Sequence, residues 1–210
     1  MLRLVIKKFD LAEGEKADEM IVNALKSIGL RPQDILGRHP HQLSGGERQR
    51  LMLARILLIK PKFIVADEPV SMIDVSLRAI FLDHLKEFKE KYGISCLYIT
   101  HDFNTAYYIA DDVVVLNCGR VVEMGKMEEV IKNPYHPYTK LLISSIPIPD
   151  PKKRWRGKLK VKELPVRELR PTKGCVFQQR CPYVMPQCKE KTPCLVEVKP
   201  DHFVACFLYE

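Results

Sequence analysis

The sequence has no apolar segment long enough to cross a lipid bilayer. Its best apolar run, residues 51–59, is interrupted by Arg55 and is far shorter than the roughly 18 residues that a membrane-spanning helix needs. The apolar stretch at residues 4–6 is also too short for a secretory signal. Hydrophobic residues at 46% and charged residues at 29% of the 210 residues are typical of a globular chain, which argues against disorder. We therefore expect a cytoplasmic protein with a packed core.

A second absence concerns the binding of phosphate groups. Nucleotide-hydrolysing enzymes often carry the loop G-x4-G-K-[ST], in which backbone N–H groups and a lysine hold the phosphates. None of the ten glycines begins such a loop. The nearest match runs from Gly119 to Gly125 and Lys126, but it is one residue too long and lacks the hydroxyl.

The positive charge is concentrated in one segment. The net charge is +8, and residues 150–173 carry ten lysines and arginines against three acidic residues. Such a segment attracts nucleic acid or anionic lipid, but Trp155 is the only aromatic side chain in it that could stack on a base. A solvated linker is the favoured interpretation, and we expect no nucleic-acid partner.

Apolar periodicity predicts both helices and strands. Three segments predict helices, over residues 17–28, 44–59 and 75–91. Short continuous apolar runs at 63–66 and 94–99 predict strands buried on both faces. Their order, strand then helix then strand, predicts a βαβ unit with a parallel sheet. A hairpin is expected over 113–124 and a short helix over 126–132, and the composition changes near Pro147.

The segment Ser44-Gly45-Gly46-Glu47 opens the second predicted helix. Ser44 and Glu47 have the spacing of a capping box, which explains both residues by local structure. The two glycines need another reason, because glycine destabilises a helix by about 1 kcal/mol per residue. Bare glycines at a helix start allow backbone N–H groups to approach a phosphate closely. Taken alone, the segment is more often a capped helix than a phosphate site.

Polar residues follow both predicted strands. Asp67-Glu68-Pro69 ends the first strand and Thr100-His101-Asp102 ends the second. Carboxyl ends of parallel strands form one edge of a sheet, where ligands bind in open α/β folds. Asp67 is a candidate ligand of Mg²⁺, Glu68 a candidate for orienting or deprotonating water, and His101 a candidate contact to a γ-phosphate. Each tripeptide alone is equally consistent with a solvated loop or a helix cap.

Cysteines gather in the tail. Five of the seven lie in the last 36 residues, at Cys175, Cys181, Cys188, Cys194 and Cys206. Cytoplasmic chains rarely keep disulfides, so the cluster predicts a metal or iron–sulfur site. The spacing fits neither a zinc ribbon nor a bacterial ferredoxin, and the residues alone leave the metal unspecified.

Together these motifs resemble the ATP-binding-cassette (ABC) ATPases over residues 17–125. The segment starting at Ser44 is similar to the signature loop, residues 63–68 to the Walker B strand with its catalytic glutamate, and His101 to the switch histidine. Residues 71–74 look like the D-loop, with Met-Ile where Ala-Leu is usual. The resemblance implies that Glu68 and His101 are catalytic, that Asp67 binds Mg²⁺, and that ATP is contacted by Ser44, Gly45, Gly46, Glu47, Asp67 and Asp74.

The resemblance extends to one subfamily. Residues 133–139, Asn-Pro-Tyr-His-Pro-Tyr-Thr, are similar to a segment of oligopeptide and dipeptide importer ATPases, and residues 40–43 agree with it. The tail is similar to the cysteine module of that subfamily. This similarity implies a [4Fe–4S] cluster, with Zn²⁺ as the alternative, held by Cys175, Cys181, Cys188 and Cys206, and leaves Cys194 as the odd residue.

The resemblance also implies a fold, an activity and partners. The expected fold is α/β, a partial P-loop-type parallel sheet with a helical segment, plus a small irregular cysteine-rich C-terminal module. The expected segments are a helical subdomain remnant (1–60), the C-terminal half of a nucleotide-binding domain (61–146) and the importer-type extension (147–210). The P-loop, the Q-loop and the first strands of the family are missing, so we expect a truncated or split chain with an exposed apolar sheet edge.

The expected function is that of an ATPase subunit, coupling ATP binding and hydrolysis to the import of di- or oligopeptides or related solutes. The implied partners are a second ABC ATPase in a head-to-tail dimer and transmembrane permease subunits, on the inner face of the cell membrane. The alternative is a non-catalytic regulatory or iron–sulfur-carrying component. A DNA-maintenance ATPase is disfavoured, because no sustained heptads are present.

The missing phosphate-binding loop leads to a prediction. The purified chain alone should hydrolyse Mg²⁺-ATP at a negligible rate, because phosphoryl transfer depends on positioning the phosphates and neutralising their charge. Phosphate release measured beside that of an intact ABC ATPase checks this. Turnover comparable to that of the intact enzyme would contradict it.

Overall fold

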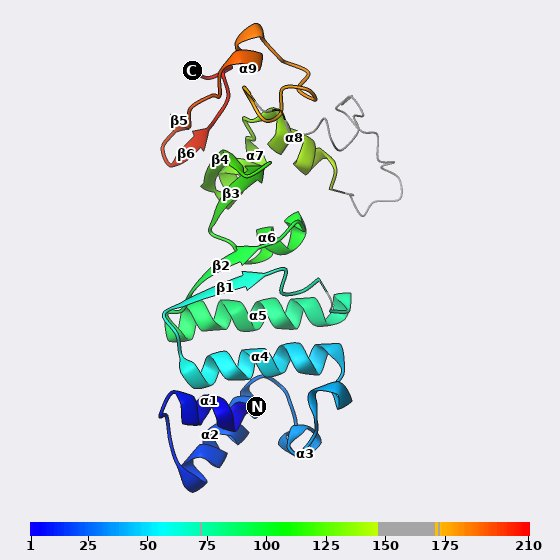
Figure 1. Cartoon of the computed structure of the whole chain (residues 1–210), viewed down its shortest axis with the longest axis vertical. Coiled ribbons are helices and arrows are strands. Elements are labelled where there is room, and N and C mark those ends of the chain that lie inside the picture. Colours follow the sequence, from blue (N-terminus) through cyan, green and yellow to red (C-terminus); the bar gives the residue numbers. More distant parts are fainter. Residues whose placement is uncertain (72, 147–170, 172) are drawn as a thin grey trace. The chain divides into compact units, whose positions relative to one another are not determined.

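The computed structural model describes residues 1–71, 73–146, 171 and 173–210 (Figure 1). Most of the basic segment 150–173 therefore lies outside the described residues. The chain divides into two compact units, Met1–Ile109 and Ala110–Glu210. These units do not coincide with the segments predicted from the family resemblance, 1–60, 61–146 and 147–210, because the tail pairs with the hairpin that precedes residue 147. Each unit is described by itself.

The first unit begins with a group of helices. They are α1 (Leu2–Lys8), α2 (Gly14–Ser27), α3 (Pro32–Ile35), the 3₁₀ turn η1 (Pro40–Gln42) and α4 (Gly45–Ile59). The helices α2 and α4 were predicted, whereas α1 was not. Helix α3 and the turn η1 each start at a proline, which suits the first position of a helix because its ring presets φ.

A parallel strand pair follows the helices. Strand β1 (Phe63–Asp67) pairs with β2 (Ser95–Ile99) in a register that sets Phe63 beside Ser95 and Asp67 beside Ile99. Helix α5 (Val75–Tyr92) connects the two strands and ends at Gly93, and α6 (Phe103–Ile109) closes the unit. This arrangement confirms the predicted βαβ unit and its parallel sheet.

One face of this sheet packs on the helices and the other is exposed. Ile64 and Tyr98 pack against the core. Its most buried side chains include Leu25 of α2, Ile28 at the C-cap of α2, Leu53 of α4 and Phe88 of α5. On the opposite face Phe63, Val65 and Leu97 are each at least half exposed. The expectation that both strands are buried on both faces is therefore wrong for the described residues, in which this sheet has two strands.

The second unit is built on an antiparallel sheet with the strand order β3-β4-β6-β5. Its elements are β3 (Asp112–Asn117), β4 (Arg120–Lys126), α7 (Met127–Lys132), α8 (Pro137–Ser144), α9 (Pro186–Glu190), β5 (Val196–Lys199) and β6 (His202–Val204). The predicted hairpin is present. The separate cysteine-rich module is not confirmed, because β5 and β6 of the tail extend the hairpin sheet.

Gly125 belongs to this sheet. A Cβ atom at Gly125 would lie 2.9 Å from the carbonyl oxygen of Asp201, so the close approach of the turn before β6 requires a glycine there. The second glycine of the incomplete phosphate-loop pattern therefore has a packing role in a strand.

A buried carboxylate joins three parts of the second unit. The Glu123 side chain is fully buried and accepts hydrogen bonds from the backbone N–H groups of Tyr135 (2.8 Å) and His136 (3.0 Å) and from His202 Nε2 (2.8 Å). His136 Nδ1 in turn accepts from the Tyr138 N–H and caps α8, and burial lowers the pKa of His136 to about 4. The segment 133–139 thus supplies two backbone N–H groups that bind the carboxylate of Glu123 in β4.

Replacing Glu123 should destabilise the second unit strongly. Glu123→Ala leaves two buried N–H groups and His202 without their acceptor, so we expect a loss of about 3–5 kcal/mol in the free energy of unfolding. The matched control is Glu128→Ala, which removes an exposed ion pair with Lys132 and should have little effect. Urea unfolding followed by circular dichroism compares them. Equal midpoints for the two variants would show that the buried contacts contribute little.

Candidate functional site

Helix α4 starts with a complete capping box. Ser44 Oγ accepts a hydrogen bond from the Glu47 N–H (3.2 Å), and Glu47 Oε2 accepts one from the Ser44 N–H (2.8 Å). The bond from the Ser44 backbone lowers the pKa of the Glu47 carboxyl and keeps it charged. Glu47 therefore faces back onto its own helix start, and the roles of Ser44 and Glu47 toward ATP stay predictions.

Gly46 has a packing reason as well as a predicted phosphate role. A Cβ atom at this position would lie 2.9 Å from Leu77 Cδ1, near the start of α5. The glycine therefore lets the start of α4 approach α5 closely. Gly45 is the first residue of α4 and is half-buried.

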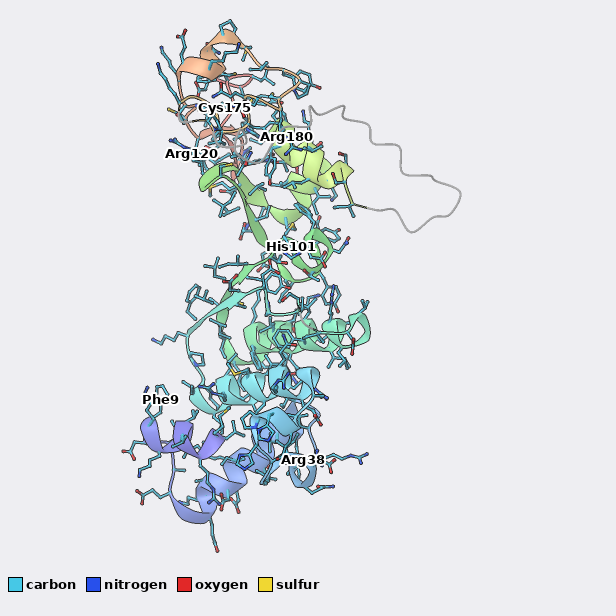
Figure 2. The ribbon with its side chains drawn as sticks, turned by 45° about the vertical axis from the view of Figure 1, so that its right-hand side comes forward. Phe9, Arg38, His101, Arg120, Cys175 and Arg180 are labelled. Atoms are coloured by element: carbon cyan, nitrogen blue, oxygen red, sulfur yellow. The ribbon has the colours of Figure 1, made fainter. Side chains whose placement is uncertain are left out.

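The structure brings Glu68 and His101 together. Glu68 directly follows β1, and its N–H donates to the Ile99 carbonyl (2.9 Å), which extends the strand pairing by one residue. Glu68 Oε1 accepts the His101 backbone N–H (3.1 Å) and lies 2.6 Å from His101 Nδ1. The His101 side chain is 84% exposed, at the start of the segment leading to α6 (Figure 2).

Glu68 has a strained backbone. Its φ is +45°, a left-handed conformation that side chains other than glycine rarely adopt, at a cost of about 1–3 kcal/mol. Such strain persists only where neighbouring contacts hold the residue, and it occurs often at functional sites. A half-buried carboxylate on an exposed imidazole ring can orient the ring or exchange a proton with water nearby.

Two further predicted residues lie at the ends of elements. Asp67 is the last residue of β1 and is exposed, and Asp74 is the exposed N-cap residue of α5. Mg²⁺ is commonly held by one or two carboxylates together with substrate phosphates, so an exposed carboxylate at a strand end suits that ion. The assignment of Asp67 to Mg²⁺ and of Asp74 to ATP stays a prediction.

Sequence reasoning missed two polar side chains beside this pair. Gln49 of α4 donates to the Pro69 carbonyl (2.5 Å), and Arg78 of α5 donates through Nε to the Ile73 carbonyl (3.1 Å). Arg78 Nη1 also lies 3.6 Å from Asp102 Oδ2. The signal for Arg78 was its position four residues after Asp74, which places it one helical turn into α5. No comparable signal singled out Gln49.

Four cysteines of the tail lie in one cluster. Cys175, Cys188 and Phe177 are buried, Cys181 packs against them, and the Cys175 N–H donates to the Cys188 carbonyl (2.8 Å). Figure 2 labels Cys175. Burial raises the pKa of the Cys206 thiol to about 11, and the negative charge of the other three thiolates adds to this. Cys194 is exposed and donates its N–H to Glu210 Oε1.

The predicted [4Fe–4S] or Zn²⁺ site is not supported. Among the described residues, no group of three or more His, Cys, Asp or Glu side chains is arranged to hold a metal ion. The buried cysteines instead pack in an apolar cluster with Phe177, with Met185 against it, and burial raises the pKa of the Cys175 thiol.

No helix in the part of the chain that the structure describes is long and apolar enough to span a membrane.

Comparisons with known proteins agree on one family. Residues 4–71 match the family model for ABC transporters, and residues 122–188 match that for the oligopeptide/dipeptide transporter C-terminal region. The chain is 40% identical over 217 residues to the oligopeptide transport ATP-binding protein AppF of Bacillus subtilis, covering 99% of this chain and 64% of AppF. It is 42% identical over 181 residues to the oligopeptide transport ATP-binding protein OppF of Salmonella typhimurium, covering 85% of this chain and 53% of OppF.

A solved structure also resembles part of the chain. The dimeric ABC cassette MJ0796, in a post-hydrolysis state bound to ADP and Pi, matches with a TM-score of 0.50 and 30% identity, over 55% of this chain and 49% of the cassette. The chain thus spans less than two thirds of the length of the curated relatives AppF and OppF.

The cysteine cluster yields a test by alkylation. At pH 8 about one in a thousand Cys206 side chains is a thiolate if its pKa is about 11, so iodoacetamide should modify Cys206 far more slowly than exposed Cys194. The rate at Cys206 should rise about tenfold per pH unit up to pH 10. Mass spectrometry of the folded chain measures both rates, and urea-unfolded protein is the control. Faster alkylation of all four clustered cysteines after treatment with a chelator would instead reveal a bound metal.

Proposed function

We propose that this chain, which belongs to the ABC transporter family of ATP-binding proteins in its oligopeptide/dipeptide branch, takes part in the ATP-driven import of di- or oligopeptides. The observation that carries the proposal is the Glu68–His101 pair at the carboxyl edge of the parallel strands. The relatives AppF and OppF are oligopeptide transport ATP-binding proteins, which supports the substrate class.

Each residue of the pair has a role in hydrolysis. Glu68 orients a water molecule and accepts its proton, because its carboxylate lies at the sheet edge and is held by the His101 N–H. His101 uses Nδ1 toward Glu68, which leaves Nε2 to contact the γ-phosphate. Asp67 is the residue that would hold Mg²⁺, which neutralises phosphate charge when bound.

The start of α4 would bind a second nucleotide. Ser44, Gly45 and Gly46 would contact ATP held by a partner ATPase in a head-to-tail dimer, through the hydroxyl and the backbone N–H groups of the helix start. The dimeric cassette structure supports a paired arrangement. Asp74, the exposed N-cap residue of α5, would also contact this ATP.

The exposed sheet face supports a composite site. Phe63, Val65 and Leu97 form an apolar surface on a two-stranded sheet, and such a surface in water favours association. We infer that a polypeptide segment outside these 210 residues covers this face and supplies the phosphate-binding loop. Membrane permease subunits would complete the importer and hold the assembly at the inner face of the membrane.

The alternative, a regulatory component that carries an iron–sulfur cluster, has less support. It needs a metal site in the tail, and the described residues provide no arrangement that holds a metal ion.

A fusion protein tests the proposed function. The segment of an intact ABC ATPase that carries the G-x4-G-K-[ST] loop is joined to Met1, which places a phosphate-binding loop before the Glu68 site in the chain. We expect the fusion to hydrolyse ATP, and Glu68→Gln to lower its turnover by about 100-fold or more with ATP binding retained. The control is Glu90→Gln, on the exposed end of α5. A fusion that binds ATP and turns over equally fast with Glu68→Gln would refute the role of Glu68.

A further inference from the structure

The short loop between Glu68 and α5 is anchored to the core. Ser71 donates through its N–H (3.2 Å) and its Oγ (2.9 Å) to the Glu68 carbonyl, and the Ile73 N–H donates to the Val70 carbonyl (3.3 Å). The side chains of Val70 and Ile73 are buried. The position of Glu68 is therefore coupled to the position of this loop.

Gln49 holds the beginning of the loop. Its Nε2 donates to the Pro69 carbonyl at 2.5 Å, directly after Glu68. Gln49 lies on α4, little more than one turn after the capping box that starts at Ser44. A side chain of α4 thus contacts the backbone next to Glu68, the candidate catalytic glutamate.

Arg78 holds the end of the loop and a second loop. Its Nε donates to the Ile73 carbonyl (3.1 Å), while Nη1 lies 3.6 Å from Asp102 Oδ2. Asp102 directly follows His101, and its Oδ1 caps α6 through the Asn104 N–H (3.0 Å). Both side chains of this ion pair are about two thirds buried, which reduces screening by solvent.

We propose that Gln49 and Arg78 are positioning residues that fix Glu68 against His101. Glu68 and His101 belong to two different loops, so their contact requires both loops to be held in place. Gln49 and Arg78 hold the Glu68 loop at its two ends, and Arg78 also holds the His101 loop. Gln49 belongs to α4, which begins after Ser44. A nucleotide bound at Ser44 would therefore affect the position of the Glu68–His101 pair through Gln49. The inference rests on the proposed function for its consequence in hydrolysis.

The His101 backbone N–H provides a direct readout. It donates to Glu68 Oε1, whereas Gln49 and Arg78 bond to the carbonyls of Pro69 and Ile73. The hydrogen exchange of the His101 N–H therefore reports on the Glu68–His101 pair at a position outside the altered residues. We expect Gln49→Met and Arg78→Met each to raise exchange of the His101 N–H at least tenfold, measured by NMR on the full chain. Arg78→Lys keeps the charge near Asp102 but not the Nε donor, and should have an intermediate effect.

Two control variants separate positioning from general destabilisation. Lys91→Met removes an exposed ion pair with Glu87 at the far end of α5, and should leave exchange of the His101 N–H unchanged. Leu85→Ala weakens the buried core without touching either loop, and should raise exchange across the whole unit. Exchange at His101 that rises no more in Arg78→Met than in Leu85→Ala, at matched stability, would overturn the proposal.

The exchange measurement does not depend on ATP hydrolysis. If the fusion protein is inactive, the proposed function fails, while exchange at His101 still decides whether Gln49 and Arg78 position the pair. In an active fusion, Arg78→Met should lower kcat with KM for ATP unchanged within twofold. An unchanged kcat would overturn the positioning role and leave the proposed function standing.

Discussion

The parallel pairing of β1 with β2 is the constraint on which the candidate site depends. Its register places Asp67 beside Ile99, so the residues that follow each strand leave the sheet at the same edge. The Glu68 N–H continues the pairing onto the Ile99 carbonyl, and the carboxylate of Glu68 then meets the backbone and ring of His101. A shift of the register by two residues would separate the pair by about 7 Å, the length of two residues in a strand, and remove both contacts.

The helices that pack against the sheet hold the paired strands and the loop after Glu68 in place. Helix α5 is the crossover, and its start approaches α4 closely enough that Leu77 would contact a side chain at position 46. The same two helices carry Gln49 and Arg78, whose side chains donate hydrogen bonds to the loop after Glu68. The strained φ of Glu68 is maintained by this surrounding set of hydrogen bonds, since a residue in a left-handed conformation relaxes when its neighbours allow it. The opposite sheet face is apolar and exposed, which gives the unit a surface suited to a covering segment.

The second unit depends on a different interaction. Glu123 is buried in β4, and its two oxygens collect the N–H groups of Tyr135 and His136 and the His202 ring. This single side chain therefore connects the hairpin, the loop before α8 and the final strand. Cys175 and Cys188 lie in an apolar cluster of the same unit, and burial raises the pKa of the Cys206 thiol to about 11.

The sequence by itself determined the three main helices of the first unit, its two strands and the sheet edge. The capping box at Ser44, the stop at Gly93 and the apolar runs of β1 and β2 are local signals, and a βαβ unit allows one handedness of crossover, so Glu68 and His101 were placed on one edge. The tertiary structure alone decided the contacts across that edge. It set the φ of Glu68 and the one-sided burial of the strands. It also made the bond from Gln49 to Pro69, the bridge from Arg78 to Asp102 and the pairing of β6 with β4, which join residues 20 to 81 positions apart. Such contacts arise from the packing of whole elements, for which no short stretch of sequence carries a signal.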